Sequence, residues 1–223
     1  LTIVISIFLI LQPDFGQACL ILFGWSVVYF VAGAHFLLLL GVAAAAIGLG
    51  SFAYTYSEHF ARRIDGFLSP DLDPKTQLGY ATNAIQEGGF FGVGVGEGQV
   101  KWSLPDAHTD FIIAVAAEEY GFVLVGLILT IYAAIVCISL ARLLRERDVF
   151  VRLAGTGLVC MFGIQAVINI GVAARLLPAK GMTLPFVSYG GSSLIAGGIS
   201  IGILLALTRS RPQRNIADIF IKG

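Results

Sequence analysis

The sequence predicts an all-α fold, a polytopic transmembrane helix bundle with a large extracytoplasmic loop. Hydrophobic residues make up 57% of the chain and charged residues only 13%. This is more apolar surface than one soluble core of 223 residues can hide. The charges are also clustered in a few segments. The apolar runs between them approach the ~20 residues that a helix needs to cross a bilayer.

The apolar runs are predicted to be helices, because a backbone in lipid must bond its polar groups within its own segment. The first run, 1–11, is already apolar at its start and has no initiator Met, so we expect a part of a longer protein. Further spans are expected at 15–33, 36–56, 111–141, 153–174 and 192–208. Residues 1–223 then form a single membrane domain with an extracytoplasmic loop at 57–109.

The orientation follows from the basic residues in short connections, which are enriched on the cytoplasmic side. One basic loop lies between the fourth and fifth predicted spans, and a basic segment follows the last span: Arg142, Arg145, Arg147 and Arg152, then Arg209, Arg211 and Arg214. Alternation places the corner at 12–14, the segment 57–109 and the connection 175–192 outside. Three polar elements therefore share one end of the bundle.

The segment 57–109 is too long for a plain connector. Its apolar residues, among them Phe90, Phe91 and Trp102, are expected to hold it against the bilayer or the bundle. Residues 69–74 have turn chemistry, and 80–87 predict a short helix. Residues 92–98 read GVGVGEG, which fits neither the dinucleotide nor the P-loop spacing, so tight turns are favoured over nucleotide binding.

Several polar residues inside or beside the spans have structural interpretations. Asp14, after Pro13, is expected to cap the second helix. Gln165 and Asn169 are four residues apart on one helix face and predict hydrogen bonds between helices. The three cysteines are widely spaced in apolar runs, which favours packing over a disulfide framework or a metal site.

Two longer motifs resemble signatures of the SEDS family, the shape, elongation, division and sporulation polymerases. Residues 104–111 read LPDAHTDF, with EEYG at 118–121, and residues 180–193 read KGMTLPFVSYGGSS. Shorter matches extend over nearly the whole chain in the family's order. The stretch 178–185 resembles the division branch, FtsW, more than the elongation branch, RodA. Residues 79–83 depart from the family's usual pattern, so no role is carried over for them.

The resemblance implies a peptidoglycan glycosyltransferase of the bacterial inner membrane with its catalytic face outside. It would join lipid II units by inverting attack of an acceptor sugar hydroxyl on a lipid pyrophosphate donor. A class B penicillin-binding protein and other divisome proteins are the implied partners. About four N-terminal helices of the family's ten would lie outside this chain.

Asp110 is the candidate general base for this displacement, which needs one group to take the hydroxyl proton. Counting ~20 apolar residues back from Arg142 puts the outer hydrocarbon edge near Gly121. Asp110 would then lie ~16 Å further out, at ~1.5 Å per residue, where lipid headgroups are found. The alternative is a helix cap, and the motif match favours catalysis.

Glu118 and Glu119 cannot both face the same pocket as Asp110, so structural pairing with cations or amides is favoured for them. The leaving pyrophosphate calls for cations. Lys180 is favoured because its stretch includes Gly181, Gly190 and Gly191, which permit close backbone approach. The other candidate substrate-binding residues are Arg62, Arg63, Lys101 and Arg175.

No metal ligands are predicted, although a divalent cation, Mg²⁺ or Mn²⁺, could share the charge of the pyrophosphate. A lipid-linked precursor transporter is the alternative function. A transporter would need a polar path through both leaflets, usually with internal symmetry. An elongation polymerase of the RodA type and a purely scaffolding membrane protein are further alternatives.

Overall fold

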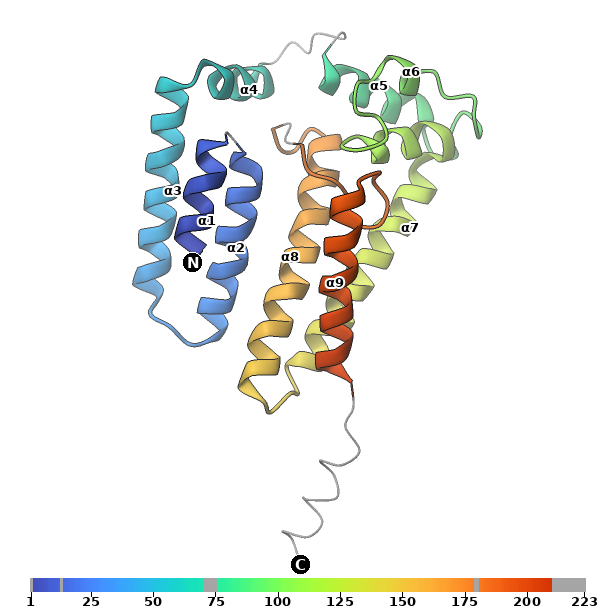
Figure 1. Cartoon of the computed structure of the whole chain (residues 1–223). Coiled ribbons are helices and arrows are strands. Elements are labelled where there is room, and N and C mark those ends of the chain that lie inside the picture. Colours follow the sequence, from blue (N-terminus) through green and yellow to red (C-terminus); the bar gives the residue numbers. More distant parts are fainter. Residues whose placement is uncertain (1, 13, 70–75, 179–180, 210–223) are drawn as a thin grey trace, which may run out of the picture.

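The computed structural model describes residues 2–12, 14–69, 76–178 and 181–209. Every regular element within these ranges is a helix, which confirms the predicted class. Two groups of helices stand side by side (Figure 1). One group is α1 (Thr2–Leu11), α2 (Phe15–Val31) and α3 (Phe36–Tyr56), and the other is α7 (Ile112–Leu143), α8 (Val149–Ala173) and α9 (Gly191–Thr208). Contacts between α2 and α8 join the groups.

Four of the described helices, α3, α7, α8 and α9, are long and apolar enough to cross a membrane. Their bounds lie within a few residues of the predicted spans. The two remaining predicted spans form shorter helices, α1 with 10 residues and α2 with 17. As predicted, Asp14 caps α2, because its carboxylate accepts a hydrogen bond of 3.2 Å from the backbone N–H of Gln17.

Three short helices lie across one end of the bundle: α4 (Glu58–Leu68), α5 (Gln77–Gly88) and α6 (Val100–Ser103) (Figure 1). The predicted helix at 80–87 is the core of α5, which begins after the N-cap Thr76. Helix α4 was not predicted from the sequence. Its signals were the cap at Ser57, which accepts from the N–H of Phe60 at 3.3 Å, and the apolar spacing of Phe60, Ile64 and Phe67. The predicted turn at 69–74 lies, except for Ser69, outside the described residues.

The basic connection between α7 and α8 lies at the opposite end of the bundle from α4–α6 (Figure 1). Asp148 begins α8 there by accepting a hydrogen bond of 3.0 Å from the N–H of Phe150. Arg209 follows α9 at that same end. The separation of basic connections from the long polar segment agrees with the charge pattern that predicted the orientation.

α7 is broken at Gly121, where the backbone has φ +74° and ψ −171°. The break leaves polar groups unpaired on both sides, and the segment 89–94 supplies their partners. Before the break, the carbonyls of Glu118 and Glu119 accept from the N–H groups of Val93 and Gly94, at 2.9 and 3.2 Å. After it, the N–H groups of Phe122 and Val123 donate to the carbonyls of Gly89 and Phe90, at 2.9 and 3.3 Å. The loop therefore completes the hydrogen bonding of the broken helix.

Candidate active site

The two longer motifs meet at the end of the bundle that carries α4–α6. Three consecutive carbonyls of the first motif, those of residues 108–110, each accept a hydrogen bond from the second motif or from α8. The donors and distances are the N–H of Tyr189 to His108 at 2.9 Å, the hydroxyl of Ser188 to Thr109 at 2.5 Å, and the amide of Asn169 to Asp110 at 3.0 Å. The backbone around Asp110 is thus fixed by residues 59 to 79 positions away in the chain.

Asn169 joins both motif loops to α8. Its side-chain amide also donates to the carbonyl of Met182 at 2.6 Å, and the residue is 1% exposed. One turn earlier, Gln165 donates to the carbonyl of Thr183 at 3.1 Å. The prediction that these two amides bond to other helices was wrong, because their acceptors lie in loops.

We expect Asn169→Leu to lower the free energy of unfolding by about 1–3 kcal/mol, since two carbonyls lose their donor in a buried place. Thermal unfolding of the purified protein in detergent would measure the change. Gln165→Leu is the matched control, because Gln165 is only half-buried and donates one hydrogen bond. Equal melting temperatures for wild type and Asn169→Leu would contradict this role.

Asp110 does not cap α7. The N-cap of that helix is Phe111, and no side chain makes a cap hydrogen bond there. The Asp110 side chain is half-buried, and burial raises the pKa of its carboxyl, with a smaller contribution from the nearby charge of Asp106. Gly181 leaves room beside the carboxylate, since a Cβ at that position would lie 3.3 Å from Asp110 Oδ2. The structural alternative for this carboxylate, helix capping, is therefore not realised.

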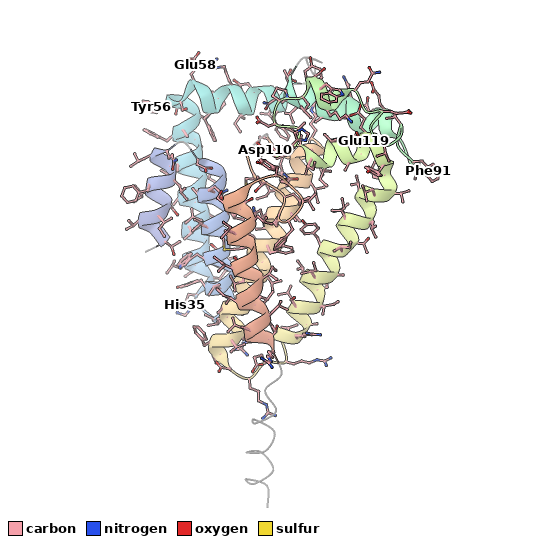
Figure 2. The ribbon with its side chains drawn as sticks, turned by 45° about the vertical axis from the view of Figure 1, so that its right-hand side comes forward. His35, Tyr56, Glu58, Phe91, Asp110 and Glu119 are labelled. Carbon is pink, nitrogen blue, oxygen red and sulfur yellow. The ribbon has the colours of Figure 1, made fainter. Side chains whose placement is uncertain are left out.

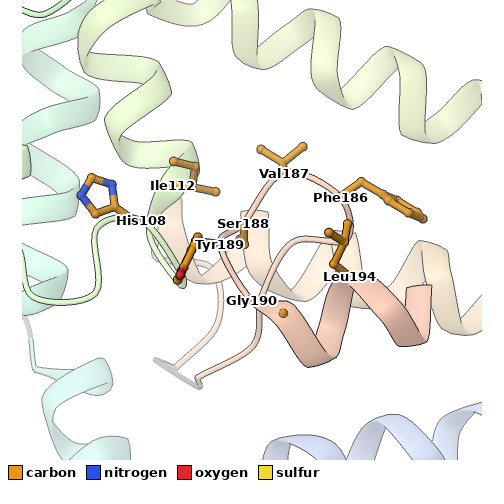
Figure 3. Close-up of a pocket in the computed structure, with 9 residues that line it drawn as sticks. His108, Ile112, Phe186, Val187, Ser188, Tyr189, Gly190 and Leu194 are labelled. Carbon is orange, nitrogen blue, oxygen red and sulfur yellow. The ribbon is translucent and has the colours of Figure 1, made fainter. Parts of the chain in front are cut away.

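An open cavity of about 630 Å³ is lined by residues of both motifs (Figure 3). Its walls come from His108 and Ile112, which flank Asp110 in the chain, and from the second motif and the start of α9: Phe186, Val187, Ser188, Tyr189, Gly190, Gly191 and Leu194. Of these residues, only Gly190 and Gly191 were predicted to have a role in the site. The cavity leaves space for a bulky ligand beside His108 and Ile112, which lie two positions from Asp110 in the chain.

The described cations predicted to bind substrate have other partners. Lys101 Nζ forms an ion pair of 2.5 Å with Glu119 Oε1, with both side chains largely buried. Arg175 Nη2 donates to the carbonyl of Ser69 at 2.7 Å. Arg62 lies 3.7 Å from Glu58 in an exposed pair. Their contact with substrate stays a prediction.

Two further candidates are not described at the level of side chains. Lys180 lies outside the described residues, and so does the side chain of Arg63, which belongs to α4. Their roles also stay predictions.

The two glutamates of α7 have structural roles, as predicted. Glu119 pairs with Lys101. Glu118 is 1% exposed, and its Oε1 accepts from the N–H groups of Gln99 and Val100 at 2.7 and 2.9 Å. In Figure 2, Glu119 lies on the broken upper part of α7, and Asp110 lies toward the middle of the bundle. These acids hold the start of α6 against α7 and thereby support the path of the chain to Asp110.

Among the described residues, no group of three or more His, Cys, Asp or Glu side chains could hold a metal ion.

The family model of the FtsW, RodA and SpoVE cell cycle proteins matches residues 1–213. The chain belongs to this family. A probable peptidoglycan glycosyltransferase FtsW of Caulobacter vibrioides is 43% identical over 92% of the chain and 52% of its own length. The stage V sporulation protein E of Bacillus subtilis is 37% identical over 94% of the chain and 59% of its own length. The chain thus spans about half the length of these relatives.

Two solved structures have the same arrangement of helices. A chain from a peptidoglycan synthase complex that coordinates polymerization and crosslinking gives a TM-score of 0.78 at 35% identity, covering 95% of this chain and 60% of that one. The rod shape determining protein RodA of Thermus thermophilus, in a mutant form, gives 0.64 at 32% identity, covering 95% and 55%. With its four long apolar helices, this member of the family is a multi-pass membrane protein.

Proposed function

We propose that the protein is a peptidoglycan glycosyltransferase that polymerises lipid II into glycan strands during cell division. The names of its relatives in Caulobacter, Trichlorobacter and Geobacter, all probable FtsW glycosyltransferases, support both the reaction and the division role over an elongation role. The single structural observation that carries the proposal is the position of the half-buried Asp110. Asn169 of α8 holds its backbone carbonyl, and His108 and Ile112, two positions to either side of it, line an open cavity.

In the proposed reaction, the 4-hydroxyl of an acceptor sugar attacks the anomeric carbon of a lipid pyrophosphate donor. The new glycosidic bond forms as the bond to pyrophosphate breaks, with inversion, and the Asp110 carboxylate takes the hydroxyl proton. Pyrophosphate is already a good leaving group, so a second carboxylate is not needed. Partial burial suits the base, because a raised pKa makes the carboxylate a better proton acceptor.

The charge on the departing pyrophosphate needs cations. Lys180 remains our first candidate, with Arg63 and Arg62 next. Lys101 and Arg175 would each have to leave a partner, Glu119 and the carbonyl of Ser69 respectively. A divalent cation, Mg²⁺ or Mn²⁺, could share this load.

We propose that the protein lies in the inner membrane with its catalytic end outside the cytoplasm. The basic α7–α8 connection at the other end of the bundle supports this orientation. A class B penicillin-binding protein is the proposed partner, alongside other divisome proteins. The structural relative from a complex that couples polymerization to crosslinking supports such an assembly.

The proposal is tested with purified full-length protein, reconstituted in vesicles with lipid II and its transpeptidase partner. Glycan strands on a polymer gel are the expected product. Movement of lipid II between leaflets without any polymer would instead support the transporter alternative.

The pH dependence of polymerisation follows from the raised pKa of Asp110. A general base must be ionised, so the rate should fall as pH drops through a pKa above the ordinary 3.8. Asp106→Asn removes a neighbouring negative charge and should shift this acid limb to lower pH. Asn suits the φ of +58° at position 106. Initial rates between pH 4 and 8 would measure the shift, and an unchanged or upward-shifted limb would contradict it.

A further inference from the structure

Within the external segment 57–109, the most exposed apolar side chains other than Trp102 lie in the turn at 89–96. Phe90 is 76% exposed, Phe91 is 84% exposed and Val95 is 69% exposed. In Figure 2, Phe91 lies at the outer edge of the molecule, pointing away from the bundle. We refer to Phe90, Phe91 and Val95 as the aromatic wing. Neither the site nor the proposed reaction uses it.

The wing is fixed at a definite height by the break in α7. The carbonyls of Gly89 and Phe90 accept from the N–H groups of Phe122 and Val123, at 2.9 and 3.3 Å. From Phe122 to Leu143, at ~1.5 Å per residue, α7 is long enough to cross the ~30 Å of hydrocarbon in a bilayer. The wing is therefore bonded to the outermost turn of a membrane span, the turn that directly follows the break at Gly121.

The wing also continues the lipid-facing surface of that span. The ring of Phe90 lies 6.4 Å from the ring of Phe122, measured between centroids. Phe122 and Val123 are themselves 56% and 57% exposed. Apolar exposure of this extent on a membrane-spanning helix is the normal surface toward acyl chains, so the wing extends an existing lipid contact.

The neighbouring residues fit the boundary between hydrocarbon and headgroups. Trp102 is 83% exposed, and the ammonium of Lys101 lies 5.5 Å from the centre of its ring. Exposed Trp residues are typical of the membrane interface.

We propose that the aromatic wing inserts into the outer leaflet of the bilayer and anchors the external segment there. Its shape favours lipid over a protein partner. The wing is a protruding turn, with glycines at positive φ at 89, 92, 94 and 96, and its side chains point outward. A fluid acyl layer accommodates such a projection without a matching groove.

The anchor has a structural consequence for the site. The same stretch of α7 that holds the wing also holds the start of α6, through Glu118 and the Glu119–Lys101 pair. That helix leads directly to residues 104–110. Insertion of the wing would thus set the height of Asp110 above the membrane. The insertion itself does not depend on which reaction the protein catalyses.

Tryptophan fluorescence in vesicles with brominated acyl chains tests the proposal. Full-length protein with its own tryptophans changed to Phe would carry Phe91→Trp, and Val95→Trp would serve as the second reporter. Leu127→Trp, at a position 55% exposed on α7, is the control within the membrane. Glu58→Trp is the control in water, since its side chain is 86% exposed at the far end of the external segment (Figure 2).

We expect Phe91→Trp and Val95→Trp to lose fluorescence to bromolipid about as strongly as Leu127→Trp. Quenching no stronger than for Glu58→Trp would overturn the proposal and place the wing in water. A reporter shielded from both bromolipid and aqueous acrylamide would also overturn it, in favour of cover by protein.

Discussion

Asp110→Asn is expected to reduce the rate of glycan polymerisation by about 10²- to 10⁴-fold, the usual weight of general-base catalysis. The amide has nearly the shape of the carboxylate, but it cannot take the proton from the hydroxyl of the acceptor sugar. Because the side chain of Asn169 on α8 holds the backbone carbonyl of Asp110, the substitution should leave the loop in place. Initial rates of lipid II consumption in reconstituted vesicles would measure the loss, with substrate affinity expected to change little.

The matched control for this variant is Glu97→Gln. It makes the same change from acid to amide on the same external segment, at an exposed position. We expect it to polymerise lipid II at close to the wild-type rate. If Asp110→Asn polymerised as fast as Glu97→Gln, Asp110 would not be the base, and the proposed mechanism would have to be abandoned.

The transmembrane helices could be predicted closely because their bounds follow from apolar length alone. The predicted span 192–208 and the observed α9, Gly191–Thr208, differ by one residue. The break at Gly121 could not be predicted, since a single glycine in an apolar run is also common in unbroken helices. What decides between the two is the segment 89–94, and its pairing with α7 is a contact between distant parts of the chain.

The site could be predicted in part. Resemblance identified the two motifs, and the chain brings them together around residues 108–110. The role of Asn169 was missed because an amide on a helix face reveals nothing of where its acceptors lie. The pairing of Lys101 with Glu119 was missed for the same reason: they are 18 residues apart, and only the path of the loop brings them into contact.

Gly121→Ala is expected to lower the free energy of unfolding by about 3 kcal/mol, which combines backbone strain with a steric clash. The φ of +74° with ψ −171° is a conformation that essentially only glycine adopts. A Cβ would lie 2.3 Å from the carbonyl oxygen of Phe90 and 2.4 Å from the nitrogen of Gly92. Both are backbone atoms held by hydrogen bonds, so they cannot move aside cheaply: the Phe90 carbonyl accepts from the N–H of Val123 across the break, and the Gly92 N–H donates to the carbonyl of Gly88.

Gly126→Ala is the control, because it lies on the same helix and no atom falls within 4 Å of its Cβ position. Alanine has the higher helix propensity, so this variant should be neutral or slightly stabilised. Thermal unfolding of both variants in the same detergent separates the two effects. Were both to melt at the wild-type temperature, the break in α7 would not constrain the chain, and the loop 89–94 would not be fixed by it. A loss confined to Gly121→Ala would mean that the height of the external segment is set by a single backbone conformation.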